Sequence, residues 1–400
     1  MLRRHRVKLR FTKEMLNLPG PIKKIGLIAA IYTLGWAIID PFFFIYLKQL
    51  FGNYAYVGLI TAVLYLFAIL WSLPLGQLVN RVSEKILLLT TLTIFLPMGY
   101  FLITIKTFTQ FFFLRVYNSF TAASIWVSLE DYVREHSDKR TAYEAFGLFD
   151  TLCSLSYVIG PIIGALLLMK FGFSSFIVVS ITGFLALLIT LTLKDHKKEG
   201  MMRGIREVVT KDKFIIREFK DFIKNKKMVR IELFSFIYIF ATSSLAMLLP
   251  LFLNEQKASY LQIGIISSLY YLPLISESYF STLKQKNKLI TRSMIVLVIL
   301  LIMISLTTSI WILFLLVAAL SLCSAAITSV IRGKLTNCIP KKECGELSGM
   351  DMSLKYAAAG LGLLLSGIAA QIFGLGYVFL IMAIVLALLL LLTSKKEFKF

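Results

Sequence analysis

Histidine and cysteine are scarce in this chain of 400 residues, which holds three histidines and four cysteines. His5, His136 and His196 all lie in polar segments, so no histidine can join a proton relay inside an apolar stretch. Cys338 and Cys344 lie in a polar loop, but their spacing matches no ordinary zinc pattern and no histidine lies near them. We therefore expect no metal site.

Motifs for nucleotide hydrolysis and for enzyme catalysis are missing as well. The sequence has no GxxxxGK[ST] loop, which excludes an ATP-driven pump within this chain. No polar segment combines paired aspartates, a ligand cluster, or a nucleophile with a histidine base. We expect a protein that is not an enzyme and that needs no cofactor. An integral-membrane enzyme and a non-transporting sensor are the less favoured functions.

Apolar residues, in contrast, are abundant: 58% of the chain is hydrophobic, and the mean hydropathy is +0.80. The apolar runs reach the length of about 20 residues that a membrane-spanning helix needs. They are continuous, without the alternation of a membrane β-barrel, so the spans must be helices. The sequence predicts an all-α integral membrane protein with spans at 22–47, 54–78, 86–105, 108–130, 143–169 and 173–193, then at 229–253, 259–282, 291–308, 310–331, 347–372 and 375–393.

This pattern of six spans, a polar break and six more spans predicts two pseudo-symmetric six-helix bundles. Internal similarity supports it, because Ile31-Tyr32 and Ile237-Tyr238 occupy corresponding positions of the two halves. The predicted parts are a lead at 1–21, a first bundle at 22–193, a linker at 194–228, a second bundle at 229–393 and a tail at 394–400.

The net charge of +21 follows from 43 basic and 22 acidic residues. Most of the lysines and arginines fall in the segments on the side that holds both chain ends. This asymmetry is the positive-inside rule, and it predicts a multi-pass protein of the cell membrane with both termini in the cytoplasm. The basic balance thus favours contact with membrane lipid over nucleic acid.

Three motifs resemble those of the major facilitator superfamily. Between spans two and three, the stretch Gly76–Lys85 is similar to its signature loop, with matches at Gly76, Leu78, Arg81 and Lys85 and departures at Asn80, Ser83 and Glu84. Arg115–Ala123 resembles the motif of its fourth span, in which the arginine is implicated in proton coupling. Ser156–Ala165, which contains Gly160, Pro161 and Gly164, looks like the fifth-span motif of its drug/proton antiporter branch. Small residues at this spacing also have a plainer explanation, close helix packing.

Charged residues inside the spans are the candidates for function, because charges in a bilayer are costly. Asp40 in span one and Arg115 in span four lie at equal depth, and we expect them to form a charge pair. Asp40 would take up a proton when the cavity opens outward and release it when Arg115 approaches. The alternative is a fixed ion pair that holds spans one and four together.

Further charges lie toward the cytoplasmic ends of the spans and predict a gate. Asp150, Glu277 and Lys355 lie at the depth expected for it, and Asp351 shares a helix face with Lys355. Ordinary contact of helix ends with water remains the alternative for these residues. The family resemblance implies a conformational latch formed by Gly76, Asn80, Arg81, Glu130 and Asp131, in which Glu130 and Asp131 pair with Arg81.

Aromatic side chains near the middles of pore-lining spans predict the substrate cavity, and Tyr65, Tyr157 and Tyr271 are the candidates. Together these features predict a monomeric secondary transporter for a small-molecule substrate that works by alternating access, with protons as the coupling ion. Efflux of drug-like or organic compounds is the first hypothesis. A proton symporter or a uniporter for a sugar or other metabolite is the alternative.

Overall fold

The computed structural model describes residues 18–79, 81–137, 142–194, 226–273, 286–336 and 344–394, and they are helical almost throughout. The first half comprises α2 (Gly20–Phe51), α3 (Tyr54–Val79), α4 (Glu84–Phe95), α5 (Met98–Thr104), α6 (Phe108–His136), α7 (Ala142–Phe171), the 3₁₀ helix η1 (Gly172–Ile177) and α8 (Val178–Leu191). The second half comprises α11 (Lys226–Thr242), α12 (Leu245–Glu255), α13 (Tyr260–Tyr271), α15 (Lys286–Leu306), α16 (Ile310–Thr336), α17 (Cys344–Phe373) and α18 (Leu375–Ser394).

The predicted all-α membrane fold is confirmed. Nine segments within the described ranges are long and apolar enough to cross a bilayer. The helix α6 is not one of them, because Arg115, Asn118 and several hydroxyl residues lower its hydropathy. These residues are buried against neighbouring helices. We call the end of the bundle at which α3, α6 and α16 finish the inner end, and the opposite end the outer end, after the orientation predicted from the sequence.

Among the residues that the structure describes, two of the predicted spans are interrupted. The third span is divided into α4 and α5 around Pro97, which lacks a backbone donor and disfavours helix in the residue before it. The seventh is divided into α11 and α12 at Ser243–Ser244, where the Ser244 hydroxyl accepts a hydrogen bond from Ser366 at 2.8 Å. A broken helix of this kind is tolerated at membrane depth when its free polar groups find partners in the protein.

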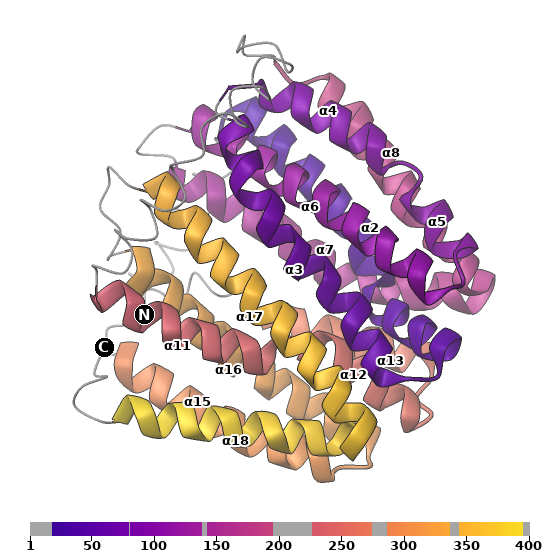
Figure 1. The fold of residues 1–400 in the computed structure, drawn as a ribbon, viewed down its shortest axis with the longest axis vertical. Helices are drawn as coiled ribbons and strands as arrows, with labels where there is room; N and C mark the ends of the chain where they lie inside the picture. The colour runs from indigo at the N-terminus through magenta and orange to yellow at the C-terminus, as the bar shows by residue number, and fades with distance from the viewer. Residues whose placement is uncertain are drawn as a thin grey trace, which may run out of the picture.

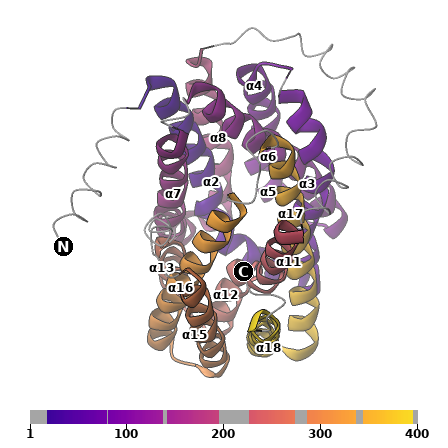
Figure 2. The ribbon, with the colours of Figure 1, turned by 90° about the vertical axis from the view of Figure 1, so that its left-hand side faces the viewer.

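The two halves occupy separate parts of the molecule, the first at the upper right of Figure 1 and the second at the lower left. The views of Figures 1 and 2 agree that α3 and α17 run side by side across the boundary. Close backbone approach explains this contact, because a Cβ added at Gly58 would lie 2.8 Å from the Cα of Gly367. The second long contact between the halves is that of α7 with α13.

At the outer end, polar side chains join the halves. The Tyr54 hydroxyl of α3 donates a hydrogen bond to Glu255 at the end of α12. The backbone N–H of Tyr54 donates to Gln371 Oε1 of α17 at 2.9 Å, and the Lys48 ammonium lies 3.6 Å from the centre of the Tyr54 ring. One residue at the start of α3 therefore connects this helix to three others at the outer end.

Candidate functional site

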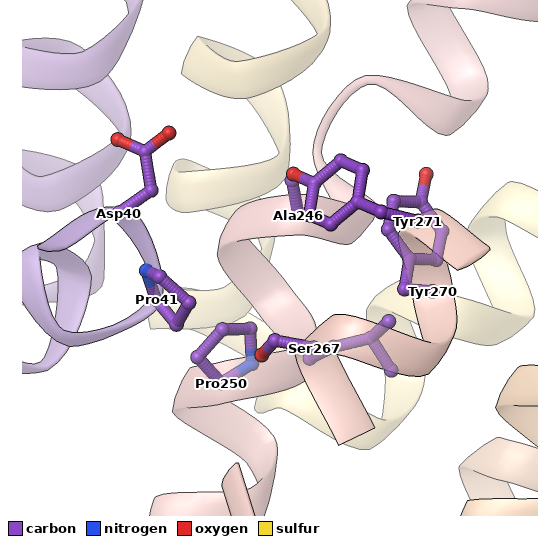
Figure 3. Close-up of a pocket in the computed structure, with 8 residues that line it drawn as sticks. Asp40, Pro41, Ala246, Pro250, Ser267, Tyr270 and Tyr271 are labelled. Carbon is purple, nitrogen blue, oxygen red and sulfur yellow. The ribbon is translucent and has the colours of Figure 1, made fainter. Parts of the chain in front are cut away.

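A pocket lies where the two halves meet, and helices of both halves form its wall (Figure 3). Its lining residues are Asp40 and Pro41 of α2, Ala246, Leu249 and Pro250 of α12, and Ser267, Tyr270 and Tyr271 of α13. Its volume is about 10 Å³, room for roughly one water molecule. In this conformation the pocket is thus small, and Asp40 is the acidic residue among those that line it.

Asp40 lies on one side of this pocket, opposite Tyr270 and Tyr271 (Figure 3). The α2 helix runs without a break through Asp40 and Pro41, and Pro41 has no backbone donor to offer the carbonyl one turn earlier. An acid at the boundary between two bundles is placed where their relative movement changes its surroundings.

Arg115, the expected partner of Asp40, makes other contacts. Its guanidinium is buried, Nε donates to the Ile60 carbonyl of α3 at 3.3 Å, and its carbon Cζ lies 5.1 Å from the centre of the Phe43 ring. No carboxylate oxygen of Asp40 lies within 4.0 Å of a guanidinium nitrogen of Arg115, the limit for an ion pair. The two charges still interact electrostatically over a longer distance. The direct pair that we expected is therefore not formed in this conformation, because Arg115 extends toward α3 while Asp40 lines the pocket beside α12 and α13. The fixed ion pair considered as its alternative is likewise not formed.

Tyrosines from four helices make two aromatic contacts across the boundary. Tyr157 of α7 stacks on Tyr271 of α13, with ring centres 4.7 Å apart and an interplanar angle of 26°. Tyr65 of α3 lies 6.2 Å from Tyr356 of α17. The structure thus brings each of the three predicted cavity tyrosines to the boundary. It adds Tyr356, which no feature of the sequence marked.

Charged residues gather at the inner end. Asp150 Oδ2 of α7 and Arg332 Nη1 of α16 form an ion pair of 3.2 Å that joins the halves, with both side chains more than half exposed. Glu130 lies in electrostatic range of Asp150, Arg332 and Lys355. The predicted gate residues that the structure describes are therefore close together, while Arg332 was missed.

Lys355 pairs with Asp351 one turn before it, at 2.7 Å. The sequence spacing had placed the two residues on one helix face, and this contact confirms that placement. Glu277, the remaining residue of the predicted gate, lies outside the described residues.

The predicted latch is only partly described. Glu130 pairs with Arg134 at 3.4 Å on its own helix, so its expected pairing with Arg81 is not seen. Asp131 lies close to Glu84 and Glu135, with one carboxylate oxygen of each within 4.8 Å of the others. All three acids have further partners in the protein, so we assign no metal to them. Asn80 lies outside the described residues, and Gly76 has no atom within 4 Å of the place where a Cβ would be.

The stretch Ser156–Ala165 packs α7 closely against α2. The Ser156 hydroxyl donates to a carbonyl of α2 at 2.8 Å. A Cβ added at Gly160 would lie 2.5 Å from that of Ala37, and one added at Gly164 only 1.9 Å from the Ile38 carbonyl oxygen. The glycines are therefore needed for the approach of the two helices.

The same stretch also contacts the second half. A Cβ added at Gly264 of α13 would lie 2.6 Å from the Pro161 carbonyl and 3.0 Å from the side chain of Ala165. The local role of this motif, as far as the geometry goes, is close packing within the first half and across the boundary.

The family model described as Major Facilitator Superfamily matches residues 25–280 and 231–397, which together cover most of the chain. The chain belongs to this superfamily. Its described helices, several of them apolar enough to cross a bilayer, are those of a multi-pass membrane protein with a transporter fold.

Solved structures of other transporters share this superfamily fold at low sequence identity. The human organic anion transporter MFSD10 (TETRAN) is 16% identical, with 94% of this chain and 99% of that chain covered and a TM-score of 0.69. The nucleoside transporter NupG is 15% identical, with 96% of this chain and 100% of that chain covered and a TM-score of 0.72. A bacterial homologue of the human lysosomal transporter Spinster, inward-facing and occupied, is 13% identical over 93% and 96% of the chains, with a TM-score of 0.75. Among curated proteins, none matches the sequence.

Proposed function

We propose that this superfamily member carries a small organic solute across the cell membrane by alternating access, coupled to protons that bind at Asp40. The observation that carries this proposal is the position of Asp40 in a pocket formed by both halves. When two bundles move relative to each other, the water access of an acid at their boundary changes, and so does its affinity for a proton.

The tyrosines at the boundary between the halves favour an organic solute with an apolar or aromatic part. The stacked pair Tyr157–Tyr271 and the pair Tyr65–Tyr356 offer ring faces and hydroxyl groups from both halves. Such amphipathic rings bind flat apolar groups and orient them through a few polar contacts. Parting of the halves would separate the members of each pair and open the space for the solute.

Efflux in exchange for protons is the direction that we propose. Its support is the stretch Ser156–Ala165, similar to that of the drug/proton antiporter branch, together with the absence of a direct bond between Asp40 and Arg115. In this scheme Asp40 binds a proton in one conformation and loses it when the cationic guanidinium comes nearer. The inner end faces the cytoplasm, and Arg81, Glu130 and Asp131 act in closing it.

We further propose a monomer whose bundles are residues 22–193 and 229–393, joined by the cytoplasmic linker 194–228. Asp150, Arg332 and Lys355 at the inner end would then form the gate on the cytoplasmic side. The contact of Tyr54 with Glu255 would form the gate on the opposite side.

The test uses purified protein in proteoliposomes and a compound found by a thermal-shift screen of organic molecules. An imposed proton gradient should drive counter-transport of that compound, and a protonophore should abolish it. Asp40→Asn should lose gradient-driven transport while it keeps binding. Ser267→Ala, which changes the same pocket without removing a charge, should keep coupling. Transport that is indifferent to the protonophore, or that runs in the same direction as the protons, would contradict the proposal.

A further inference from the structure

Glu232 is a buried acid in the second half that the transport scheme above does not use. It lies in the second turn of α11, its side chain is only 3% exposed, and neither of its carboxylate oxygens accepts a hydrogen bond from the described residues. A buried carboxylate that is ionised and without donors costs several kcal/mol, so this geometry demands a partner or a proton.

The group that faces Glu232 is a second carboxyl group. Asp351 of α17, a helix that packs against α11, lies in electrostatic range of Glu232. Its Oδ2 is bound by the Lys355 ammonium at 2.7 Å, while its Oδ1 is buried and accepts no hydrogen bond from the described part of the chain. Lys355 therefore compensates one of the two negative charges. Both oxygens of Glu232 and Oδ1 of Asp351 remain without a donor from the described residues.

Other charged groups do not supply the missing donor. Within the described part of the chain, Asp351 and Lys355 are the charged residues that interact with Glu232. On α11 itself Arg230 is exposed, and α18, which packs against α11, carries one titratable residue in its described part, Tyr377 near its outer end. The inner part of α16 brings two basic residues. They are Arg332, paired with Asp150, and Lys334, which has a partner of its own.

One proton satisfies both acids at once. We propose that Glu232 and Asp351 share a single proton beside the Lys355 ammonium, so that the second half holds a proton-binding site of its own. The proton sits on Glu232 and is donated to Asp351 Oδ1, while Asp351 stays ionised and paired with Lys355. The cluster is then neutral overall, and the buried Glu232 carries no charge.

The role of this site in transport rests on the proposed function, whereas the shared proton does not. Loss of the proton would leave two carboxylates against one ammonium and would push α11 and α17 apart. Because α11 continues through the break at Ser243–Ser244 into α12, which lines the pocket with Asp40, such a movement would reach the substrate site. The two proton sites would thus act on the two halves separately.

The experiment is infrared spectroscopy of the full-length protein in lipid nanodiscs at neutral pH, in H₂O and in D₂O. The wild-type protein should show the carbonyl band of a protonated carboxyl group that shifts on deuteration. Glu232→Gln should lose this band. Asp351→Asn should shift it, because the acceptor of the shared proton changes from a carboxylate to an amide. Glu255→Gln is the same substitution at an exposed position. It is the matched control and should leave the carbonyl bands of protonated carboxyl groups unchanged.

A spectrum of Glu232→Gln that keeps every protonated carboxyl band would overturn the proposal, since Glu232 would then be ionised. Glutamine has the shape of protonated glutamic acid and can donate to Asp351, so the variant should melt close to the wild-type temperature. A large loss of stability would also count against the shared proton. The measurement needs neither a proton gradient nor a substrate, and the band must also be present in Asp40→Asn. A failure of the proposed transport mechanism is therefore distinguishable from a failure of the shared-proton proposal.

Discussion

Gly164→Ala is the substitution for which the structure predicts the sharpest steric effect. The added Cβ would lie 1.9 Å from the carbonyl oxygen of Ile38 and 3.0 Å from the Phe42 ring. Carbon–oxygen contacts between helices normally begin at about 3.3 Å, so α7 must move away from α2 by more than about 1 Å. Overpacking of this kind costs about 1–3 kcal/mol, and a backbone obstacle places this site near the upper figure.

The gain in helix propensity from glycine to alanine, about 1 kcal/mol, offsets part of this cost. We therefore expect a net loss of about 2 kcal/mol, measured as a lower midpoint in thermal or denaturant unfolding of the detergent-purified protein. Gly76→Ala is the matched control, because Gly76 also lies in a helix but has nothing within 4 Å of its added Cβ. It should leave stability unchanged or raise it slightly. If both variants unfold at the same midpoint, α7 and α2 are not packed as described.

Substitutions at three further residues probe the contacts between the halves. Arg332→Ala removes the exposed ion pair with Asp150, so the free energy of unfolding should change by less than about 1 kcal/mol. Spin labels placed across the inner end should nevertheless report a wider distribution of distances. An unchanged distribution would argue against a gate at this end. Tyr54→Phe removes one hydrogen bond, about 1 kcal/mol, and should raise the outer-open population roughly fivefold in the same assay at the other end. Tyr157→Phe keeps the ring stacked on Tyr271 and should retain the affinity for a transported compound, whereas Tyr157→Ala should bind it about tenfold more weakly. Equal affinities of the two variants would show that this tyrosine pair does not contact the compound.

Hydropathy and turn chemistry were enough to predict most of the fold. The predicted span 310–331 corresponds to Ile310–Thr336, and the span 375–393 to Leu375–Ser394. The agreement follows because a helix needs about 20 mostly apolar residues to cross the hydrocarbon core of the bilayer. The helix breaks at Pro97 and at Ser243–Ser244 were not predicted. A proline or a serine pair is common inside membrane helices, and whether the helix breaks there depends on tertiary partners such as Ser366.

The candidate site was predicted where a residue was unusual in its own surroundings. Asp40 is an acid in a long apolar run, and the structure places it in the pocket between the halves. Glu232 and Arg332 lie near the ends of their spans, where charged residues are ordinary, so nothing in the local pattern singled them out. Their partners come from helices far away in the chain. Only the packing of α11 on α17, and of α7 and α16 on α13, brings them together.

The missing bond between Asp40 and Arg115 has a similar cause. Equal depth in the membrane brings two residues to one level, but it does not say in which direction each side chain extends. Arg115 turns toward the Ile60 carbonyl and the Phe43 ring, and Asp40 toward α12 and α13. A charge pair predicted from depth alone therefore needs the rotation of both helices to be known.

The most direct test of the central claim, that Asp40 exchanges a proton for the solute, is the proton release that accompanies binding. The transported compound is added to the wild-type protein and to Asp40→Asn in weakly buffered detergent solution, while the pH and the heat of binding are recorded. The account predicts proton release by the wild-type protein and none by Asp40→Asn, with the compound bound by both. Equal proton release by the two proteins would contradict it.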